Sequence, residues 1–334
     1  MVELEPVYLP WQQGLWDRLQ QARRQQRLPH ALLFAGPAGV GKTHFARLFA
    51  QSLLCDATSE RGDPCGQCRH CRLLSSGNHP DLQLIGPEEG SKSGEIKVDL
   101  IRELVSGTAL TAHSGGHKVV IIQPAERMNL AAANSLLKTL EEPTPGTVLM
   151  LLSDHPARLL PTIRSRCQRF VFPHPPEAEA LAWLKSRVTT DKAETLLHLA
   201  GGAPLQALEL NDEEVLIRRL ELLKTFVAMA QERRDPVKLA AEWSKQDYRQ
   251  LMEWLMGWII DMLRLRVSKN PPLLFNWDEK ATLQAVAERL DSKTLQRFLA
   301  QVYEAGNLAE TNLNPQLLLE KLLIEWHVCT HRVI

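Results

Sequence analysis

The residues with the clearest chemistry form one short run near the start of the chain. The run reads Gly36-Pro-Ala-Gly39-Val-Gly41-Lys42-Thr43, a complete phosphate-binding loop. Its glycines let backbone amides close around phosphate oxygens, Lys42 reaches the terminal phosphates, and Thr43 ligates magnesium at a helix start. The loop therefore predicts a site for ATP or ADP with magnesium. A second interpretation stays open, in which the loop keeps its shape only to hold a strand against a helix.

The apolar strand expected to complete this site ends without an acid. It spans residues 118–122 and is followed by Gln123 and Pro124. Hydrolysis of a triphosphate needs one carboxylate there to hold the metal and another to orient water. Glu126 lies three residues past that position, beyond a proline that redirects the backbone. We therefore expect the chain to bind nucleotide far better than it cleaves it, as a subordinate subunit of an ATPase assembly would.

A second group of reactive residues follows the loop. Four of the six cysteines cluster with the spacing C-x9-C-x2-C-x2-C, and they are Cys55, Cys65, Cys68 and Cys71. In a chain without a readable export signal, such a cluster indicates metal ligands more often than disulfides. Four thiolates suit tetrahedral zinc, and with all four positions filled the role would be structural. A reduced, metal-free loop is the alternative, and His70 or His79 are substitute ligands.

Composition narrows the function little. The 334 residues contain 39 Lys and Arg against 39 Asp and Glu, so any contact with nucleic acid must be local. The longest apolar run, 251–265, is interrupted by charges and is shorter than the roughly 20 residues of a membrane span. We expect a cytoplasmic protein of two or three domains, without a membrane segment.

The first half of the chain alternates strands with helices. The expected strands are 31–35, 81–85, 118–122, 147–153 and 168–172, and the expected helices are 43–54, 98–105 and 129–142. This order predicts an α/β domain, a parallel sheet with helices on both faces, interrupted by the cysteine segment as an insertion. In the last of these helices Asn129 is the expected N-cap, with an apolar face of Leu130, Ala133, Leu136, Leu137 and Leu140.

After the prolines at 173–176 the pattern becomes wholly helical. We expect helices at 177–187, 192–200 and 204–210, then a helical block over 213–328 packed around Trp243, Trp254, Trp258 and Trp326. The predicted domains are an α/β nucleotide-binding domain over 1–172 with a zinc module at 55–79, a small helical lid over 173–212, and an all-helical domain over 213–334.

Two further motifs carry a resemblance. Residues 134–143 read N-S-L-L-K-T-L-E-E-P, and Ser165-Arg166-Cys167 stands at the base of the last strand. With the phosphate loop, the cysteine insertion and His79-Pro-Asp81, they resemble the clamp-loader family of AAA+ proteins. The resemblance covers residues 10–172 by motif and the remainder by its helical plan.

That resemblance implies roles for single residues. Arg166 matches the family's arginine finger, which reaches a triphosphate held by a neighbouring subunit; a surface arginine paired with a nearby carboxylate is the alternative. Leu205 stands where an ATP-sensing arginine is expected, and residues 153–155 stand loosely at a second phosphate sensor. Lys138 would face the central DNA chamber, or simply be solvated.

The resemblance also implies a function and partners. The chain would act within the DNA polymerase III holoenzyme, helping to load the sliding clamp onto primed DNA. Its partners would be clamp-loader subunits of the tau/gamma and delta types, joined through the all-helical domain as an oligomerisation collar. The isolated chain would not hydrolyse ATP. Two other classes remain open: an active clamp-loader ATPase, and a zinc-dependent DNA-binding module without a nucleotide role.

Overall fold

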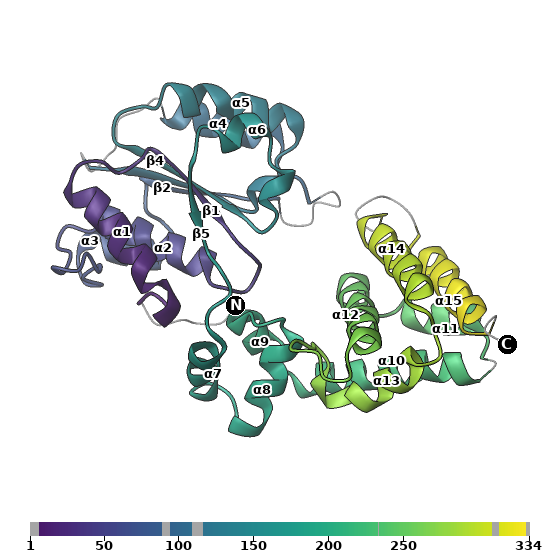
Figure 1. Cartoon of the computed structure of the whole chain (residues 1–334). Helices are drawn as coiled ribbons and strands as arrows, with labels where there is room; N and C mark the ends of the chain where they lie inside the picture. The colour runs from purple at the N-terminus through teal and green to yellow at the C-terminus, as the bar shows by residue number, and fades with distance from the viewer. Residues whose placement is uncertain (1–6, 89–93, 109–115, 233, 309–313, 332–334) are drawn as a thin grey trace. The chain divides into compact units, whose positions relative to one another are not determined.

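The computed structural model describes residues 7–88, 94–108, 116–232, 234–308 and 314–331. The chain divides into two compact units, each with its own core (Figure 1). The first runs to Trp183 and takes in Ala203–Gln206, and the second holds Leu184–Gly202 and the chain from Ala207. The finer division into three domains stays a prediction.

A five-stranded sheet forms the centre of the first unit. Its strands are β1 Ala31–Ala35, β2 Leu82–Ile85, β3 Lys118–Ile122, β4 Thr147–Ser153 and β5 Gln168–Val171. They lie in the order β2-β3-β4-β1-β5, and every neighbouring pair is parallel. Every residue of β1, β3 and β4 is buried, which explains why these strands read as continuous apolar runs. The predicted parallel sheet is confirmed.

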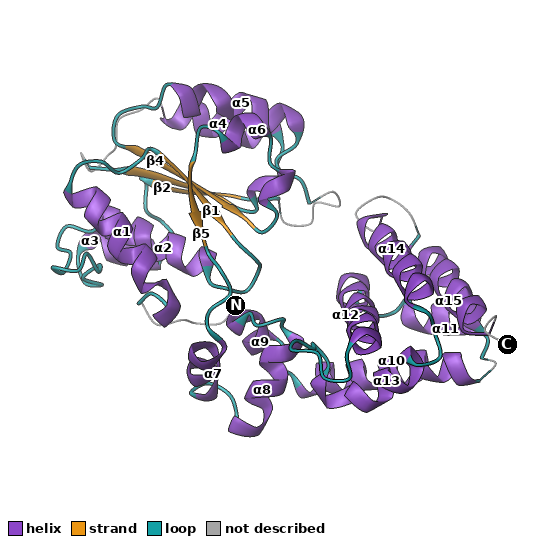
Figure 2. Cartoon of the chain, in the orientation of Figure 1, coloured by secondary structure: helices purple, strands orange, loops and turns teal. Residues whose placement is uncertain are grey.

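Helices cover both faces of this sheet. The helices of this unit are α1 Gln13–Arg24, α2 Lys42–Leu54, α3 Arg69–Ser75, α4 Val98–Thr108, α5 Leu130–Glu141, α6 Pro161–Arg164 and α7 Glu177–Lys185. Helices α4, α5 and α6 lie on one face, and α1 and α2 lie on the other (Figure 2). Because side chains alternate along a strand, Leu33 packs in the α4 and α5 cluster while Phe34 contacts Phe45 of α2.

An aromatic cluster fixes α2 on its face of the sheet. The ring of Phe45 lies 5.6 Å from Phe34, 5.7 Å from Trp16 and 5.2 Å from Phe172, measured between centroids. All four rings are almost fully buried. Edge-to-face contacts of this kind hold a helix in one orientation. The phosphate loop, which joins β1 to α2, is thereby held at both ends.

Helix α5 confirms one prediction and corrects another. The side chain of Asn129 accepts a hydrogen bond from the Ala132 amide at 2.9 Å, so it is the N-cap. Leu136 and Leu140 are buried against the sheet, as expected. Leu130, however, is 66% exposed. It is the first helical residue, and Ala132 takes the buried position in that turn instead.

The second unit is helical in its described residues. Its helices are α8 Thr190–Leu199, α10 Glu213–Gln231, α11 Pro236–Trp243, α12 Tyr248–Val267, α13 Lys280–Ala287, α14 Ser292–Leu308 and α15 Pro315–His331; α9, Pro204–Glu209, begins in the first unit. Trp243, Trp258 and Trp326 are buried in a shared core and Trp254 packs against it, which confirms their predicted packing role. No helix among the described residues is long and apolar enough to cross a membrane.

Candidate nucleotide site and cysteine cluster

The phosphate loop has a conformation that requires glycine. Gly39 and Gly41 adopt φ angles of 72° and 95°, a left-handed region that side chains with a Cβ rarely enter. A Cβ on Gly41 would also lie 2.5 Å from Cδ1 of Leu9. The loop ends where α2 begins, so its backbone amides gather at a helix N-terminus, the arrangement that favours phosphate.

Lys42 is satisfied by groups of the chain itself. Its side chain is 5% exposed, and Nζ donates to the carbonyls of Gly36 at 2.8 Å and Pro37 at 2.5 Å. Nζ also lies 2.6 Å from Oδ1 of Asp154, the residue that follows β4. The lysine that should meet the terminal phosphates is thus already paired with a carboxylate.

Gln123 reaches the loop from the end of β3. Its Nε2 donates to the hydroxyl oxygen of Thr43 at 2.6 Å. The position predicted for a metal-holding acid is therefore beside the predicted magnesium ligand, and it carries an amide. Because an amide NH₂ donates and carries no charge, it competes with a cation for the Thr43 oxygen.

Glu126 serves the backbone after β4. Its Oε1 accepts hydrogen bonds from the amides of Asp154 at 3.0 Å and His155 at 3.1 Å. The second oxygen, Oε2, is buried and accepts no hydrogen bond from the described residues. Glu126 therefore holds the turn that carries Asp154, and neither Lys42 nor Thr43 is among its hydrogen-bond partners.

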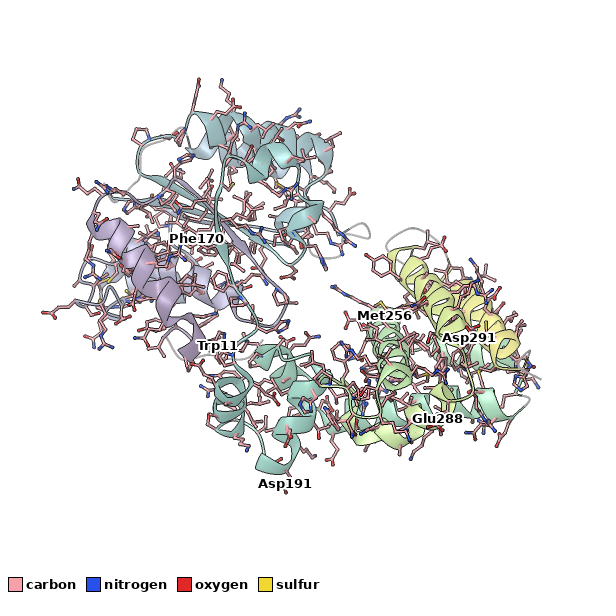
Figure 3. All side chains as sticks on the ribbon, in the orientation of Figure 1. Trp11, Phe170, Asp191, Met256, Glu288 and Asp291 are labelled. Atoms are coloured by element: carbon pink, nitrogen blue, oxygen red, sulfur yellow. The ribbon has the colours of Figure 1, made fainter. Side chains whose placement is uncertain are left out.

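Two residues that the sequence did not single out hold the far side of the loop. Gln12 is fully buried, and its Nε2 donates to the carbonyls of Val40 and Gly41, each at 3.1 Å. Trp11, labelled in Figure 3, donates from Nε1 to the same Val40 carbonyl at 3.0 Å. A buried glutamine has no periodic signature, so only the tertiary contact identifies this role.

Leu205 meets the loop through its backbone. Its amide donates to the Gly39 carbonyl at 3.0 Å, in the first turn of α9. A Cβ on Gly39 would lie 2.7 Å from Cβ of Gln206, so this turn packs tightly on the loop. Leu205 therefore lies at the loop through its backbone amide, and the resemblance to clamp loaders predicts an arginine at this position.

Arg166 follows α6 and is half-exposed. Its Nη2 lies 2.5 Å and its Nε 2.9 Å from Oε1 of Glu141, and Nη1 donates to the Thr162 carbonyl at 3.0 Å. Its side chain is 35% exposed. Cys167 beside it is buried, and burial raises the pKa of its thiol to about 12, so it packs as a neutral side chain.

The four clustered cysteines come together in space. Their Sγ atoms all lie within 4.8 Å of one another, with Cys55 and Cys68 at 3.9 Å and Cys65 and Cys71 at 4.0 Å. Sulfurs bound about 2.3 Å from a tetrahedral zinc lie about 3.8 Å apart. The cluster therefore fits a zinc ion in size as well as in ligand type.

The surrounding backbone is arranged for thiolates. Amides of Gln67 and Cys68 donate to Sγ of Cys65, and these bonds lower the pKa of Cys65 to about 6. Burial, followed by the neighbouring Cys68 and Cys55 side chains, raises the pKa of Cys71 to about 12. A bound cation is needed to keep the Cys71 sulfur deprotonated at neutral pH.

The two candidate substitute ligands bind each other. Nδ1 of His70 lies 2.8 Å from Nε2 of His79, and the amide of Asp81 donates to Nδ1 of His79 at 3.0 Å. His79 must therefore carry its proton on Nε2 and donate it to His70. The candidate ligand cluster contains the four cysteines and neither histidine.

A parallel sheet with a phosphate loop after β1, helices on both faces and a helical second unit define an AAA+ type P-loop protein. Residues 11–176 match the family model described as DNA polymerase III, delta subunit, and residues 213–328 match the model of its C-terminal part. The chain belongs to the family of DNA polymerase III delta' subunits.

Similarity to individual relatives extends over most of the chain. The DNA polymerase III subunit delta' of Pseudomonas aeruginosa is 39% identical over 323 residues, 95% of this chain and 96% of the relative. The Escherichia coli K12 subunit delta' is 32% identical over 95% of this chain and 94% of its own length. The DNA polymerase III subunit tau of Bacillus subtilis is 35% identical over 161 residues, 48% of this chain and 28% of the relative.

Proposed function

We propose that this chain is a non-hydrolysing, delta'-type subunit of the DNA polymerase III clamp loader, which helps to place the sliding clamp on primed DNA. Family membership supports the clamp-loader role. The observation that supports the absence of hydrolysis is the hydrogen bond from the Gln123 side-chain amide to the Thr43 hydroxyl oxygen. A hydrolysing site needs a carboxylate and its metal there.

Arg166 is proposed to act on the triphosphate of a neighbouring subunit. Its guanidinium is permanently charged and planar, on a side chain that is 35% exposed, which suits charge developing on transferring phosphoryl oxygens. Glu141 and the Thr162 carbonyl hold one side of the group and fix its direction. The contact with Glu141 is the carboxylate pairing named as the alternative, and it is compatible with a second contact across a subunit boundary.

The cysteine cluster is proposed to hold one structural zinc ion. Cys55 follows α2 and Cys68 caps α3, where its Sγ accepts from the Cys71 amide. Zinc would tie these two helices together and stabilise the insertion between them. With four thiolates bound, no coordination position would be left for a substrate.

Partners and location follow from the clamp-loader role. The chain would assemble with tau/gamma and delta type subunits through its helical second unit, and would meet the sliding clamp and DNA within that assembly. Lys138 on α5 is exposed, and it would face DNA there. With a net charge of zero, the isolated chain would bind DNA weakly. The proposed role in DNA replication would place the protein in the cytoplasm.

The test is a reconstituted clamp loader with Arg166→Ala in this subunit. DNA-dependent ATP hydrolysis and clamp loading should fall, since an arginine finger in trans is worth on the order of 1000-fold or more at one site. The loss in the whole assembly will be smaller because other subunits supply their own fingers. Arg166→Lys should rescue poorly, because an ammonium lacks the planar fork.

Arg164→Ala is the matched control, since Arg164 is an exposed arginine at the end of α6, two residues before Arg166. It should leave hydrolysis unchanged. Equal ATPase and clamp-loading rates in the Arg166→Ala, Arg164→Ala and unaltered assemblies would end the proposal of a trans-acting role. Tight DNA binding by the isolated chain would instead favour the DNA-binding alternative.

A further inference from the structure

We infer that Asp154 makes the phosphate loop selective for a nucleoside diphosphate over a triphosphate, and that this binding does not depend on magnesium. The inference rests on the proposed nucleotide site and adds which nucleotide that site accepts. Two neighbouring contacts support it. The Asp154 carboxylate is paired with Lys42, and the Gln123 side-chain amide donates to the Thr43 hydroxyl oxygen.

One carboxylate oxygen of Asp154, Oδ1, lies 2.6 Å from Nζ of Lys42. The strand order explains why Asp154 lies beside Lys42, because β4 is next to β1 and Ser153 pairs with Ala35. The residue after Ser153 is therefore next to the residue that opens the loop. Asp154 is 38% exposed, so its carboxylate lies at the solvent side of a lysine that is itself buried.

Glu126 holds Asp154 in place. The carboxylate oxygen Oε1 of Glu126 accepts from the amides of both Asp154 and His155, and its other oxygen is buried. These are charge-assisted bonds, which are roughly twice as strong as neutral ones. The turn carrying Asp154 is thus anchored, and Asp154 cannot leave Lys42 by a free backbone movement.

Charge then separates the two nucleotides. The lysine of a phosphate loop serves the β- and γ-phosphates, and a γ-phosphate adds negative charge at the side where Asp154 already lies. Like charges a few ångströms apart repel, and exposure of the carboxylate weakens but does not remove that repulsion. A diphosphate is held by the loop amides and the helix N-terminus and lacks the repelled group.

Magnesium would ordinarily offset the extra charge of a triphosphate. Here the Thr43 oxygen already accepts from the Gln123 amide. Among the described contacts of Lys42 and Thr43, the single carboxylate is that of Asp154, and it is paired with the lysine. A metal at this loop therefore meets few free oxygen ligands, whereas magnesium requires several in octahedral geometry.

The experiment uses the full chain and two fluorescent probes, labelled ADP and a labelled non-hydrolysable ATP analogue. Each is titrated with and without added magnesium, without chelators so that any zinc remains. We expect ADP to bind about tenfold tighter than the ATP analogue. Added magnesium should change either affinity by less than about twofold.

Asp154→Asn removes the charge and keeps the shape. It should tighten the ATP analogue by about tenfold and remove the preference for ADP. Asp99→Asn is the matched control, because Asp99 is 80% exposed on α4 and pairs with Arg102. It should leave both affinities unchanged. Asp154→Ser provides a second variant, and thermal unfolding of each variant confirms that it is folded.

Equal affinities for the two probes, or an ADP preference that persists in both folded Asp154 variants, would overturn the inference. So would binding that strengthens severalfold on adding magnesium. If neither probe binds the unaltered chain or the Asp154 variants, the loop is a structural relic and the inference falls. The Arg166 role would still stand in that case, because it is measured on the neighbour's hydrolysis.

Discussion

One carboxylate oxygen of Glu141, Oε1, lies 2.9 Å from Nε and 2.5 Å from Nη2 of Arg166, and it accepts a hydrogen bond from Nε. Glu141 is the last residue of α5, and Arg166 follows α6. The two motifs that stood apart in sequence, 134–143 and 165–167, therefore meet through one ion pair. The contact orients the guanidinium of Arg166, whose side chain is 35% exposed.

The first prediction concerns the energy of this pair. Glu141→Gln and Arg166→Ala should each change the free energy of unfolding by less than about 1 kcal/mol, because the partners are 50% and 35% exposed. Urea unfolding of the isolated chain measures it. A loss of several kcal/mol in Arg166→Ala would mean that any fall in assembly ATPase reflects misfolding.

The second prediction concerns zinc. Protein purified without chelators should contain about one zinc per chain, and Cys68→Ser should lower this and loosen the segment around α3 while sparing the second unit. Cys329→Ser, in α15, is the control and should keep the metal. Metal analysis reports the content and hydrogen exchange reports the loosening. Absence of zinc from the unaltered protein would refute the assignment.

Zinc binding should also depend on pH. The pKa of Cys71 is raised to about 12 by burial, so zinc must displace its proton. Lowering the pH therefore favours the protonated thiols and weakens binding, and raising it strengthens binding. A zinc titration at several pH values measures the protons released per ion. An affinity that rises on acidification would contradict thiolate ligation.

Local sequence patterns predicted the strands and helices of the first unit, the position of Gln123 beside Thr43, and the cysteine cluster. Gln123 could be placed beside Thr43 because the carboxyl ends of parallel strands share one edge of a sheet. The cysteine cluster followed from spacing, since four thiolates within a short segment have few ways to avoid one another. The cysteine contacts join residues that are close in sequence, whereas Gln123 and Thr43 are 80 positions apart and meet because both lie at the carboxyl edge of the sheet.

The Asp154 contact could not be predicted in this way. It requires that β4, and not another strand, pair with β1, and that Ser153 align with Ala35. Strand order in a parallel sheet is set by how the crossover helices pack, which one sequence does not state. The prediction that Leu130 belongs to the buried face of α5 was wrong for a similar reason. Periodicity shows which residues share a helix face, and it does not show where the covered part of that face ends.

The third prediction tests the core of the second unit. Phe226 stacks on Trp326 with centroids 4.2 Å apart, and Nε1 of Trp326 donates to the Phe226 carbonyl at 3.1 Å. Phe226→Ala should cost about 3–5 kcal/mol, because both rings are fully buried. Chemical unfolding and recovery of assembled clamp loader are the measurements. Tyr303→Ala, at a side chain 57% exposed, should cost far less.

The fourth prediction restores a carboxylate to the end of β3. In Gln123→Asp, the acid replaces an amide that donates to Thr43, so binding of the labelled ATP analogue should become magnesium-dependent and tighten severalfold when magnesium is added. Gln123→Ala is the matched control: it frees the Thr43 oxygen without adding charge and should gain little magnesium dependence. Lys42→Ala should lose nucleotide binding in either background.

Hydrolysis should nevertheless stay at background in Gln123→Asp. The next residue is Pro124, which supplies neither acid nor base, and Glu126 is engaged by the amides of Asp154 and His155. A phosphate-release assay on the isolated chain measures turnover. Robust turnover in the unaltered protein, abolished by Lys42→Ala, would show a working ATPase. Turnover in Gln123→Asp alone would show that metal binding, and not a missing base, is what limits this site.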